Sequence, residues 1–488
     1  GNPATGLAIT FTNKMVSMDI AGLLAGRQNY TAYPALRTLS QHDTERILTQ
    51  ALSERGVEIE RGRALTDLTQ DGDTVTASVR REDGSTETVR CRWVIGCDGA
   101  HSAVRKAVGI PFAGKTYHDE FIMADAQLDW KLPHGELYAF PSPEGIFAAF
   151  SMPGENRYRI FGNVPPGPEG PSAEYSEPTH EQFQAMIDER VPFGAKVTKE
   201  YWVTRYRVHS RVVPRYRDGR AFLVGDAAHV HSPAGAQGMN TGIQDAYNLA
   251  WKLALVERGI SDTSLLDSYQ AERHPVGVQL LKTTDRLFSA IAGRNWLSRI
   301  ARGRIAPQLA THVLTRPSVR RWFVGTLAQL RLHYPDSPLN AQDGAGWHDA
   351  PAPGDRAREA DVRINGKPGH LHDVLHGTHH TVLLFTGLDD HARPAVELCR
   401  IAEQIERSYP GLVRARVISA ERFADHPAAL GDPDRSVHRQ YGITSAAAFV
   451  VRPDGHVGYR GRPVIADLLL ADLAARLPGA SALAPSRA

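Results

Sequence analysis

Cysteine is scarce in this sequence, with only Cys91, Cys97 and Cys399 among 488 residues. They form no C-x-x-C pair and no spacing typical of zinc ligands, so we expect neither a disulfide framework nor a bound metal. A reducing cytoplasm is then the natural compartment. The chain also has no apolar run near the roughly 18 residues that a membrane-spanning helix needs, and no charged-then-apolar leader at its start.

The sequence also has no large excess of positive or negative charge. The formal charge of +2 at pH 7 gives no electrostatic footprint for nucleic acid or for an acidic membrane surface. The hydrophobic content of 42% and the charged content of 23% are ordinary for a globular protein, but 488 residues are too many for one compact core. We therefore expect two or three domains and no nucleic-acid or membrane partner.

The first 110 residues mix helix and strand patterns. Ser40 marks a capped helix start, and an apolar stripe at helical spacing follows it. The strands expected next lie at 56–60, 74–80, 87–92 and 93–96, the second and third forming a hairpin. The last of these strands runs directly into Asp98-Gly99.

Short strands broken by Pro and Gly dominate from about residue 111 to 215. They are expected at 121–128, 136–140, 145–150 and 158–161. An α/β pattern then returns, with a buried strand at 221–224 and a helix at 241–257. A sheet-rich insertion inside an α/β domain indicates a separate domain that faces a substrate.

The C-terminal half begins with Arg-rich amphipathic helices over 280–333, which we interpret as a support packed on the preceding domain. A shift to Pro, Asp and Gly then marks a linker. A second α/β unit follows, with strands at 382–385 and 448–451, and the final Ala/Pro/Ser tail is expected to be disordered.

The segment LVGDAAHVHSPAGAQGMN, residues 223–240, carries the clearest chemical signal. Gly225-Asp226 ends a buried strand and precedes a Gly-rich turn and a helix. An open α/β sheet binds its ligand outside the carboxyl ends of its strands, where an acidic side chain can accept hydrogen bonds from sugar hydroxyls. The glycines let backbone approach a planar ring, and the helix start offers free N–H groups to an electron-rich edge. A plain connector would explain the turn alone.

With the residues that follow it, this segment closely resembles the second FAD motif of the class A flavoprotein monooxygenases, relatives of p-hydroxybenzoate and phenol hydroxylases. The resemblance implies that Asp226 binds the ribitol of FAD, that Pro233 lies at the reactive edge of the ring, and that backbone at the Gly-Met-Asn positions binds the isoalloxazine. Ser232 and Ala236 depart from a more usual Pro and Gly. The residues so implied to contact FAD are Asp226, Pro233, Gly235, Gly238, Met239 and Asn240.

Residues 97–105, CDGAHSAVR, carry a second pattern. A helix that starts at Ser102 would supply N–H groups and Arg105 to a phosphate. The string matches the family's D-G-x-x-S-x-V-R motif, and the resemblance places Asp98 and Arg105 near the FAD pyrophosphate. It also implies an FAD contact for Gln41, at the predicted helix start, and for Leu65, near the adenine.

The resemblance extends from about residue 1 to 475 and includes Tyr269 and Glu272-Arg273-His274-Pro275, which also suit a helix stopped by Pro275. It implies an α/β fold: a Rossmann-like FAD-binding domain with an inserted β-rich substrate domain and a C-terminal thioredoxin-like α/β domain. Without C-x-x-C, packing or a dimer contact is the expected role of that last domain. The expected division is an FAD-binding domain at 1–110 and 216–335 with supporting helices, a substrate domain at 111–215, a linker at 336–356, a thioredoxin-like domain at 357–478 and a disordered tail at 479–488.

No G-x-G-x-x-G string occurs, although this family opens with a βαβ unit that carries it and whose helix start holds the FAD pyrophosphate. Gly1 corresponds to a point inside the family's first domain. We therefore expect the FAD-binding part at 1–110 to be truncated, and the chain as written to bind FAD poorly or not at all.

The resemblance implies an FAD-dependent monooxygenase that hydroxylates an aromatic, phenolic or polyketide-like small molecule with NAD(P)H and O2, through a flavin C4a-hydroperoxide. The protein then positions the substrate and keeps water away, so no general acid or base is named. His229, His231 and Tyr206 are expected to pack or to support other groups. The aromatic residues that are candidates to line the substrate pocket, although half or more should be core, are Phe140, Phe150 and Phe161.

Several alternatives stay open. The same fold and cofactor also suit Baeyer–Villiger insertion or epoxidation, whereas the absence of a W-x-W-x-I-P string disfavours halogenation. A cofactor-free, non-enzymatic remnant is favoured by the missing first motif and disfavoured by the two motifs that are present. A homodimer is compatible with the sequence, which does not determine the oligomeric state.

Overall fold

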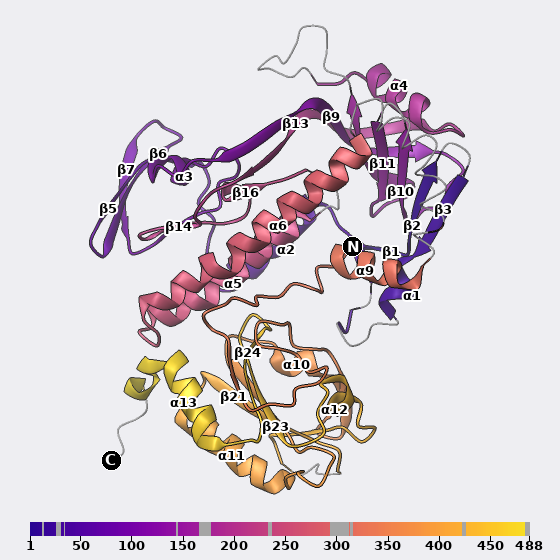
Figure 1. The fold of residues 1–488 in the computed structure, drawn as a ribbon. Helices are drawn as coiled ribbons and strands as arrows, with labels where there is room; N and C mark the ends of the chain where they lie inside the picture. The colour runs from indigo at the N-terminus through magenta and orange to yellow at the C-terminus, as the bar shows by residue number, and fades with distance from the viewer. Residues whose placement is uncertain are drawn as a thin grey trace. The chain divides into compact units, whose positions relative to one another are not determined.

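The computed structural model describes residues 1–11, 14–25, 31–33, 35–142, 145–164, 177–232, 237–292, 312, 316–421 and 426–483 (Figure 1). The chain forms two compact units, which we describe separately. The first comprises Gly1–Gly26, Ala35–Gly242 and Val276–Ala328, and the second comprises Arg27–Pro34, Ile243–Pro275 and Gln329–Ala488. Two long helices, α5 (Gly238–Glu257) and α6 (Asp267–Ala292), each contribute residues to both units.

An eight-stranded sheet forms the larger part of the first unit, in the order β16-β13-β9-β12-β11-β10-β2-β3. The β-rich pattern predicted between 111 and 215 is therefore confirmed, and β2 and β3 join the sheet from the first 20 residues, which the sequence pattern did not indicate. The strands are β2 (Gly6–Phe11), β3 (Lys14–Asp19), β9 (Ala113–Asp129), β10 (Glu136–Ser142), β11 (Gly145–Ser151), β12 (Arg157–Val164), β13 (Lys196–Val212) and β16 (His229–Val230).

The two longest strands, β9 and β13, pair antiparallel with irregularities in register. Two of these irregularities are bulges in β13, because Val197 and Lys199 face consecutive residues of β9, and so do Glu200 and Trp202. The third lies between Arg207 and His209, where β9 carries the extra residues.

The two faces of this sheet bury different residues, because successive side chains of a strand point to opposite sides. One face packs under α4 (His180–Arg190), whose Phe183 and Ile187 join a core of small and aromatic side chains. Alternate residues of the same strands form a second apolar cluster on the other face, here called the second face. It contains Phe121, Ile146, Ala148, Phe161 and Val208, with Tyr117, Met123, Phe150 and Tyr206 packed beside them.

The rest of the first unit is α/β. A small sheet in the order β14-β15-β8 contains β14 (Arg217–Asp218), β15 (Ala221–Leu223) and β8 (Val94–Gly96), and a separate antiparallel sheet contains β5 (Arg63–Asp71), β6 (Thr74–Arg81) and β7 (Thr86–Cys91). The remaining elements are β1 (Asn2–Ala4), β4 (Leu36–Thr38), α1 (Ile20–Ala25), α2 (Gln41–Ser53), α3 (Ala103–Ala107), η1 (Gly225–Ala227) and α9 (Pro317–Leu327).

The strand expected at 56–60 does not form, and the apolar stripe expected on α2 is not buried. Residues 56–60 alternate as a strand should, but they are irregular and exposed, because none of the described strands pairs with them. The helix start at Ser40 is confirmed, since its side chain accepts a hydrogen bond from the Asp43 N–H. The apolar stripe of α2 nevertheless stays exposed, with Ile47 at 48% and Leu48 at 54%.

The predicted helix stop at Pro275 is wrong. α6 continues through Pro275 to Ala292. A proline inside a helix removes its own hydrogen bond to the residue four positions earlier and its ring crowds that carbonyl, yet α6 is helical on both sides of Pro275. Within the Arg-rich stretch at 280–333, the described parts include the end of α6 and α9 (Pro317–Leu327), and residues 293–311 and 313–315 lie outside the described residues.

The second unit contains the C-terminal α/β part. Its eight-stranded sheet has the order β17-β24-β23-β20-β21-β22-β18-β19, and the strands predicted at 382–385 and 448–451 lie at its centre. The strands are β17 (Ala341–Asp343), β18 (Asp361–Ile364), β19 (Lys367–His370), β20 (His380–Phe385), β21 (Val413–Ser419), β22 (Ala429–Gly431), β23 (Ala447–Val451) and β24 (Val457–Gly461). The helices are η2 (Thr263–Leu266), α10 (Leu371–Leu375), α11 (Ala395–Ser408), α12 (Ser436–Gln440), α13 (Ala466–Arg476) and η4 (Pro478–Leu483).

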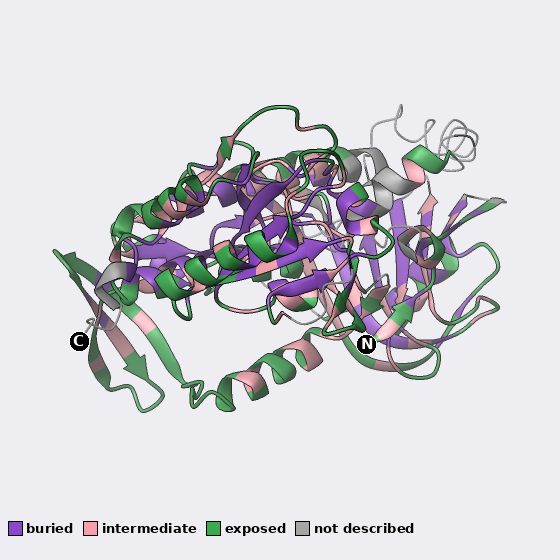
Figure 2. Ribbon diagram, turned by 90° about the horizontal axis from the view of Figure 1, so that it is seen from below, coloured by how far each residue is buried: buried purple, intermediate pink, exposed green. Residues whose placement is uncertain are grey.

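Helices cover both faces of this sheet, and its central strands are buried, as are most strands in Figure 2. All six residues of β20 are buried, because apolar clusters lie on either side of it. One cluster includes Leu255 and Ile260, from the end of α5 and the turn after it. The helices that precede the C-terminal part in the chain are thus built into its core.

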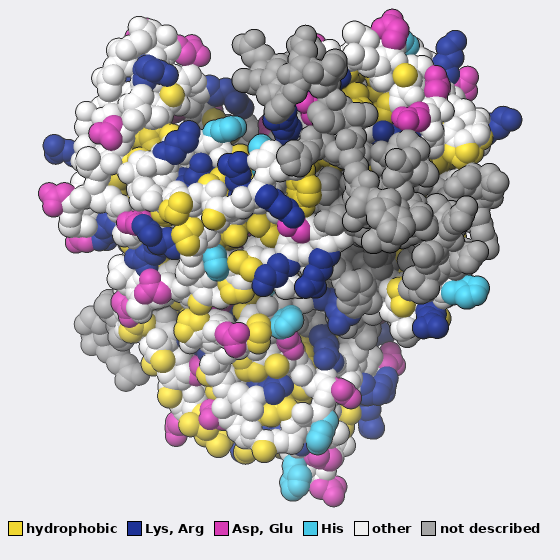
Figure 3. Space-filling view, turned by 45° about the horizontal axis from the view of Figure 1, so that its top comes forward, with side chains coloured by type: hydrophobic (Ala, Val, Ile, Leu, Met, Phe, Trp, Pro, Cys, Tyr) yellow, Lys and Arg dark blue, Asp and Glu magenta, His cyan; other side chains and the backbone are white. Residues whose placement is uncertain are grey.

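None of the described helices is long and apolar enough to cross a membrane. Within the described part of the chain, no group of three or more His, Cys, Asp or Glu side chains is placed to hold a metal ion. On the face shown in Figure 3, Lys and Arg side chains occur in many places and Asp and Glu side chains lie among them.

One buried histidine makes the stability of the second unit sensitive to pH. His380 at the start of β20 is 2% exposed, and the Trp251 ring lies edge-on to it with 5.7 Å between ring centroids. Burial, together with the nearby Arg476 and Arg452, lowers the pKa of His380 from 6.5 to about 3. The imidazole is therefore neutral in the folded protein at pH values where the unfolded chain binds a proton.

We expect the free energy of unfolding to fall as the pH falls from 6.5 to 3, since the unfolded chain alone takes up this proton. In His380→Gln, the slope of that free energy against pH should be shallower by up to about 1.4 kcal/mol per pH unit between pH 4 and 6. Urea titrations at several pH values measure it. The exposed His376→Gln is the control and should keep the original slope; equal slopes in both variants would contradict the assignment.

Candidate flavin-binding site

The candidate site is built on two short parallel strands. β8 and β15 pair in register from Ala221 opposite Val94 to Leu223 opposite Gly96, and the Val224 N–H continues the ladder by donating to the Gly96 carbonyl at 3.0 Å. Both carboxyl ends therefore lie at the same edge of the sheet. Asp98 and Asp226 follow these ends, which is the edge at which open α/β sheets bind ligands.

Two glycines bring the first turn of α5 to this edge. Gly225 has a φ of +58°, which a side chain would strain, and a Cβ built on it would lie 3.4 Å from the Cα of Gly242. The turn after β15 and the start of α5 thus meet backbone to backbone. Gly238, Met239 and Asn240 form the first turn of α5, where N–H groups have no acceptor within the helix.

Asp226 is the acidic group at this edge. It lies in η1, directly after Gly225, and its side chain is exposed. No hydrogen bond or ion pair holds its carboxylate among the described residues, unlike that of Asp98. The group is therefore available to accept hydrogen bonds from a ligand, and the positive end of the α5 dipole lies on the same side.

Asp98 has a structural task that the sequence did not reveal. Its Oδ2 accepts hydrogen bonds from the N–H groups of Ala103 at 2.7 Å and Val104 at 3.1 Å, and Ser102 Oγ accepts from the Arg105 N–H at 2.9 Å. The first N–H groups of α3 are thus occupied by the protein itself. The expectation that they are open to a phosphate is wrong, because an Asp placed five residues earlier satisfies them.

Arg105 is buried rather than extended into solvent. Its Nη1 donates to the Ala100 carbonyl at 2.9 Å, and its guanidinium lies 4.3 Å from the centre of the Phe112 ring. Burial lowers the pKa of Arg105, and Asp98 opposes that shift. The side chain thus fixes the turn after β8, next to the candidate site.

Of the remaining residues predicted to contact FAD, one lies near the candidate site, one does not, and two are not described. Leu65 is half-buried on β5, opposite Val79, and β5 packs against α3, so it belongs to the same neighbourhood as Arg105. Gln41 is exposed at the start of α2, and its amide donates to Glu45 on its own helix at 2.8 Å. Among the described residues, no hydrogen bond joins it to the site. Pro233 and Gly235 lie outside the described residues.

His231, set aside in the sequence as a packing residue, lies next to the start of α5. Its Nδ1 is 2.8 Å from the Ser232 carbonyl and must donate to it, which leaves the lone pair on Nε2. A Cβ on Gly238 would lie 3.5 Å from that Nε2, which has no hydrogen-bond partner among the described residues. Burial lowers the pKa of His231, so the ring is neutral near pH 7. The position of His231 beside the first turn of α5 is visible only in the structure, because no sequence pattern predicts this contact.

The large sheet is joined to this edge by β16. His229 and Val230 follow η1 directly and pair with Val212 and Arg211 of β13, and the Val213 N–H donates to the Ala228 carbonyl at 2.9 Å. The strand that carries Tyr206 of the second face thus ends beside η1. The turn that contains Asp226 and the β-rich part of the unit are therefore directly connected.

The three phenylalanines proposed for the substrate pocket lie on two opposite faces of the large sheet. Phe150 and Phe161 lie on the second face, with 5.6 Å between their ring centroids. Phe140 belongs to the opposite core under α4, so it does not share a face with the other two. The period-two alternation of β10 explains this difference, because Phe140 is on the side of Tyr138, which packs in the same core.

The FAD binding domain family matches residues 1–284, more than half of the chain. The chain belongs to this family. A relative, 6-methylpretetramide 4-monooxygenase from Streptomyces rimosus, is 34% identical over 440 residues, which cover 88% of this chain and 74% of that protein. Membership explains why the ends of β8 and β15, the α5 start and the long inserted sheet occur together.

Solved structures agree with this assignment. OxyS anhydrotetracycline hydroxylase from Streptomyces rimosus matches with a TM-score of 0.68 at 30% identity, covering 96% of this chain and 85% of that one. The flavin-dependent monooxygenase PieE, solved in complex with FAD and substrate, matches with a TM-score of 0.74 at 22% identity, covering 99% and 86%, and so shares the fold. The predicted family, the α/β fold class with its Rossmann-like domain, and FAD as the cofactor are confirmed.

We expect Asp98→Ala to destabilise the turn between β8 and α3, because two N–H groups lose a charged acceptor. Because Asp98 is exposed and water can replace part of its contacts, the free energy of unfolding should fall by about 0.5–2 kcal/mol in urea titrations. Asp98→Asn keeps a carbonyl oxygen at the same place and should recover about half of that loss. Equal stability of the wild type and Asp98→Ala would contradict the capping role.

Proposed function

We propose that this chain binds FAD at the carboxyl ends of β8 and β15 and uses NAD(P)H and O2 to hydroxylate an aromatic, phenolic or polyketide-like small molecule. The proposal departs from the expectation, based on the missing G-x-G-x-x-G string, that the chain as written binds FAD poorly or not at all. The observation that carries the proposal is the placement of the free Asp226 carboxylate beside the first turn of α5, in a chain of the FAD-binding family. Relatives named as monooxygenases and hydroxylases supply the reaction class.

The residues present fit the cofactor. Asp226 would accept hydrogen bonds from the ribitol hydroxyls, and the N–H groups of Gly238, Met239 and Asn240 would face the electron-rich edge of the ring. Gly225 and Gly242, which meet backbone to backbone, add no side chain of their own between this turn and α5. Bound FAD would supply the redox chemistry and the activation of O2.

The other predicted contacts take supporting roles in this proposal. Asp98 and Arg105 hold the turn between β8 and α3 in the shape that the pyrophosphate side needs. Leu65 on β5 lies beside that turn, near the place expected for the adenine. Gln41, Pro233 and Gly235 stay in the proposal on the motif alone.

The second face of the large sheet is the proposed substrate side. It offers apolar and aromatic side chains and one polar atom without a partner, the Tyr206 hydroxyl, which is buried and makes no hydrogen bond among the described residues. Burial raises the pKa of Tyr206, so this hydroxyl stays protonated and can donate. A phenolic or ketone oxygen of a bound substrate would satisfy it.

A further polar pair borders the second face. The Tyr117 hydroxyl donates to Asp285 of α6, and Lys115 Nζ lies 3.0 Å from the same carboxylate. Burial and the hydrogen bond to Asp285 raise the pKa of Tyr117. These contacts of Tyr117 and Lys115 with Asp285 fix the start of β9 to α6 beside the second face.

A visible spectrum of the purified chain with added FAD tests the proposal directly. We expect flavin absorption to stay with the protein, and an aromatic substrate to accelerate NAD(P)H oxidation and gain one oxygen atom by mass. Asp226→Ala should raise the FAD dissociation constant about 10- to 100-fold, because it removes a charged acceptor.

Asp434→Ala is the matched control for this series. Asp434 is an exposed aspartate of the second unit with no hydrogen bond or ion pair among the described residues, so its loss should leave FAD binding unchanged. Absence of bound flavin in the wild type would overturn the proposal. An inserted ring oxygen or an epoxide among the products would instead assign the same flavin to a different oxygenation.

Tyr206→Phe should separate binding from folding. Removing a buried hydroxyl that has no partner should leave the free energy of unfolding unchanged or higher. The KM of the aromatic substrate should rise about 10-fold, because a donor to the substrate oxygen is lost. Tyr138→Phe is the control: its hydroxyl donates to the Pro133 carbonyl at 2.8 Å in the opposite core, so this variant should lose stability and keep its KM. An unchanged KM in Tyr206→Phe would exclude this contact.

A further inference from the structure

The second unit contains a pocket of about 240 Å³ that is partly open to solvent. Trp251 of α5 forms part of its wall, together with residues within 261–265, 338–341 and 472–478. The start of β20 contributes His380. All of these residues belong to the second unit, so the pocket is formed within one unit. We call it the Trp251 pocket.

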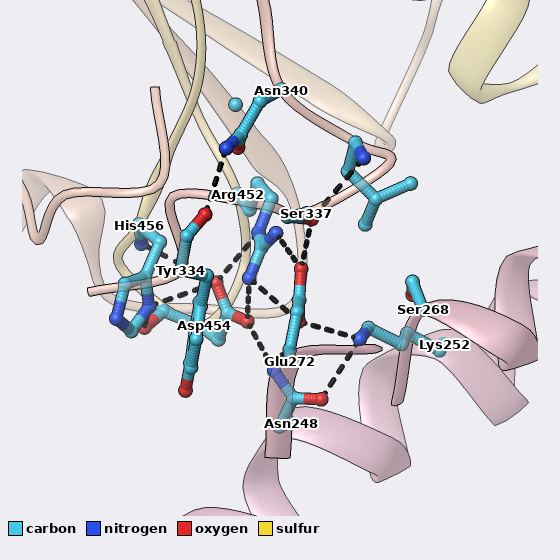
Figure 4. A network of polar contacts seen from close by, with 12 residues as sticks. Asn248, Lys252, Ser268, Glu272, Tyr334, Ser337, Asn340, Arg452, Asp454 and His456 are labelled. Carbon is cyan, nitrogen blue, oxygen red and sulfur yellow. Dashed lines mark hydrogen bonds and ion pairs between the residues drawn. The ribbon is translucent and has the colours of Figure 1, made fainter. Parts of the chain in front are cut away.

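A polar network holds the ring of Trp251 in place. The indole N–H donates to Asp454 Oδ2 at 3.2 Å. Asp454 also accepts hydrogen bonds from Arg452 Nη2 at 2.6 Å and from Asn248 Nδ2 at 3.2 Å (Figure 4). The side chains of Arg452 and Asp454 are almost fully buried, so the network is rigid. An aromatic wall is therefore present before any ligand binds, which lowers the entropic cost of binding a flat apolar molecule.

The charged groups of the lining favour a neutral ligand. Arg476 donates to both oxygens of Asp472, at 2.6 and 2.7 Å, and to the Leu339 carbonyl at 2.8 Å. This cation is thus not free to bind an anion. Asp262 is exposed to water and accepts a hydrogen bond from the Ser264 N–H at 2.8 Å, so it attracts a cation only weakly.

His380 is the polar side chain of the lining that a ligand can satisfy. It is 2% exposed, and neither ring nitrogen makes a hydrogen bond within the described part of the chain. Asn340 Oδ1 also has no partner there, but protein atoms enclose it, and the Asn340 amide nitrogen is bound to the Tyr334 carbonyl at 2.7 Å (Figure 4). The ring nitrogens of His380 are not enclosed in that way. Because burial lowers the pKa of His380, its neutral ring offers one N–H donor and one lone pair near pH 7.

We propose that the Trp251 pocket binds a small neutral phenol, whose ring packs on Trp251 and whose hydroxyl forms a hydrogen bond with His380. The volume suits a single substituted ring, since an apolar cavity of about 150 Å³ already holds benzene. The hydroxyl can donate to or accept from an imidazole, and so offsets the free energy that a buried polar group without a partner costs. The second face belongs to the first unit, so phenol binding here does not depend on the proposed function.

Photolabelling of the full chain with 4-azidophenol tests the proposal, because light converts the azide to a nitrene that attaches to neighbouring residues. We expect peptide mapping to find the label on peptides that contain Trp251, 338–341 or 472–478. Phenol should suppress this labelling at a concentration about 2- to 10-fold lower than anisole, since the methyl ether has no O–H to donate. Labelling only at other peptides, or equal suppression by phenol and anisole, would overturn the proposal.

Ala475→Phe and Ala474→Phe form a matched pair for this experiment. Both alanines are exposed on α13, so both variants should keep the native far-UV circular dichroism, but of the two only Ala475 lines the pocket. A phenylalanine at 475 should fill the pocket and lower the labelling of its peptides at least about 10-fold, whereas a phenylalanine at 474 should leave the labelling unchanged. Equal labelling of the two variants would contradict the assignment of the pocket.

His380→Phe separates the hydrogen bond from the apolar contacts. It keeps an aromatic ring at the start of β20 and removes both ring nitrogens, which have no protein partner to lose among the described residues, so the variant should fold. Phenol and anisole should then suppress the labelling at equal concentrations. A phenol advantage that persists in the folded variant would exclude His380 as the hydrogen-bonding group.

Discussion

The pairing of β8 with β15 is the constraint on which the candidate site depends. Only three residues on each strand form the ladder, yet it sets where Asp98 and Asp226 emerge. A slip by one residue would move Asp226 by about 3.3 Å and reverse every side chain of the strand. The backbone contact between Gly225 and Gly242 fixes the same turn to α5, so two short-range contacts together define the edge.

Structural features that depend only on residues close together in the sequence could be predicted. The Ser40 cap, the hairpin of β6 and β7, the buried strand before Gly225 and the helix after Gly238 all depend on neighbours within a few residues. Residues 56–60 show the limit of this logic. Their alternation is a correct local signal, but a strand forms only where another strand offers a hydrogen-bonding edge. The Asp98 contact with α3 was hidden for a similar reason, because the same residues suit both a cap and an anion site.

Buried charge was the least predictable part. Glu272 and Arg273 looked like the polar end of a helix stopped by Pro275, yet both lie inside α6 at 2% exposure or less. Their partners are remote in sequence: Ser337 is 65 residues and Arg452 is 180 residues from Glu272, and Tyr334 is 61 residues from Arg273. No periodicity joins such positions. The flavin motif was recognisable because its residues are contiguous, whereas Glu272 and Arg273 and their partners are not.

The two bulges of β13 constrain how this strand can change over evolutionary time. Each one adds a residue and so exchanges inward and outward positions for everything that follows; together they cancel, which is why Val197 and Val203 pack in the same core. Deletion of one bulge alone would carry Tyr206 from the second face into the core under α4 and bring charged neighbours to the apolar side. Length changes in this part of the strand are therefore tolerated only in pairs, so that gaps and insertions in this protein's lineage should occur as compensated events rather than singly.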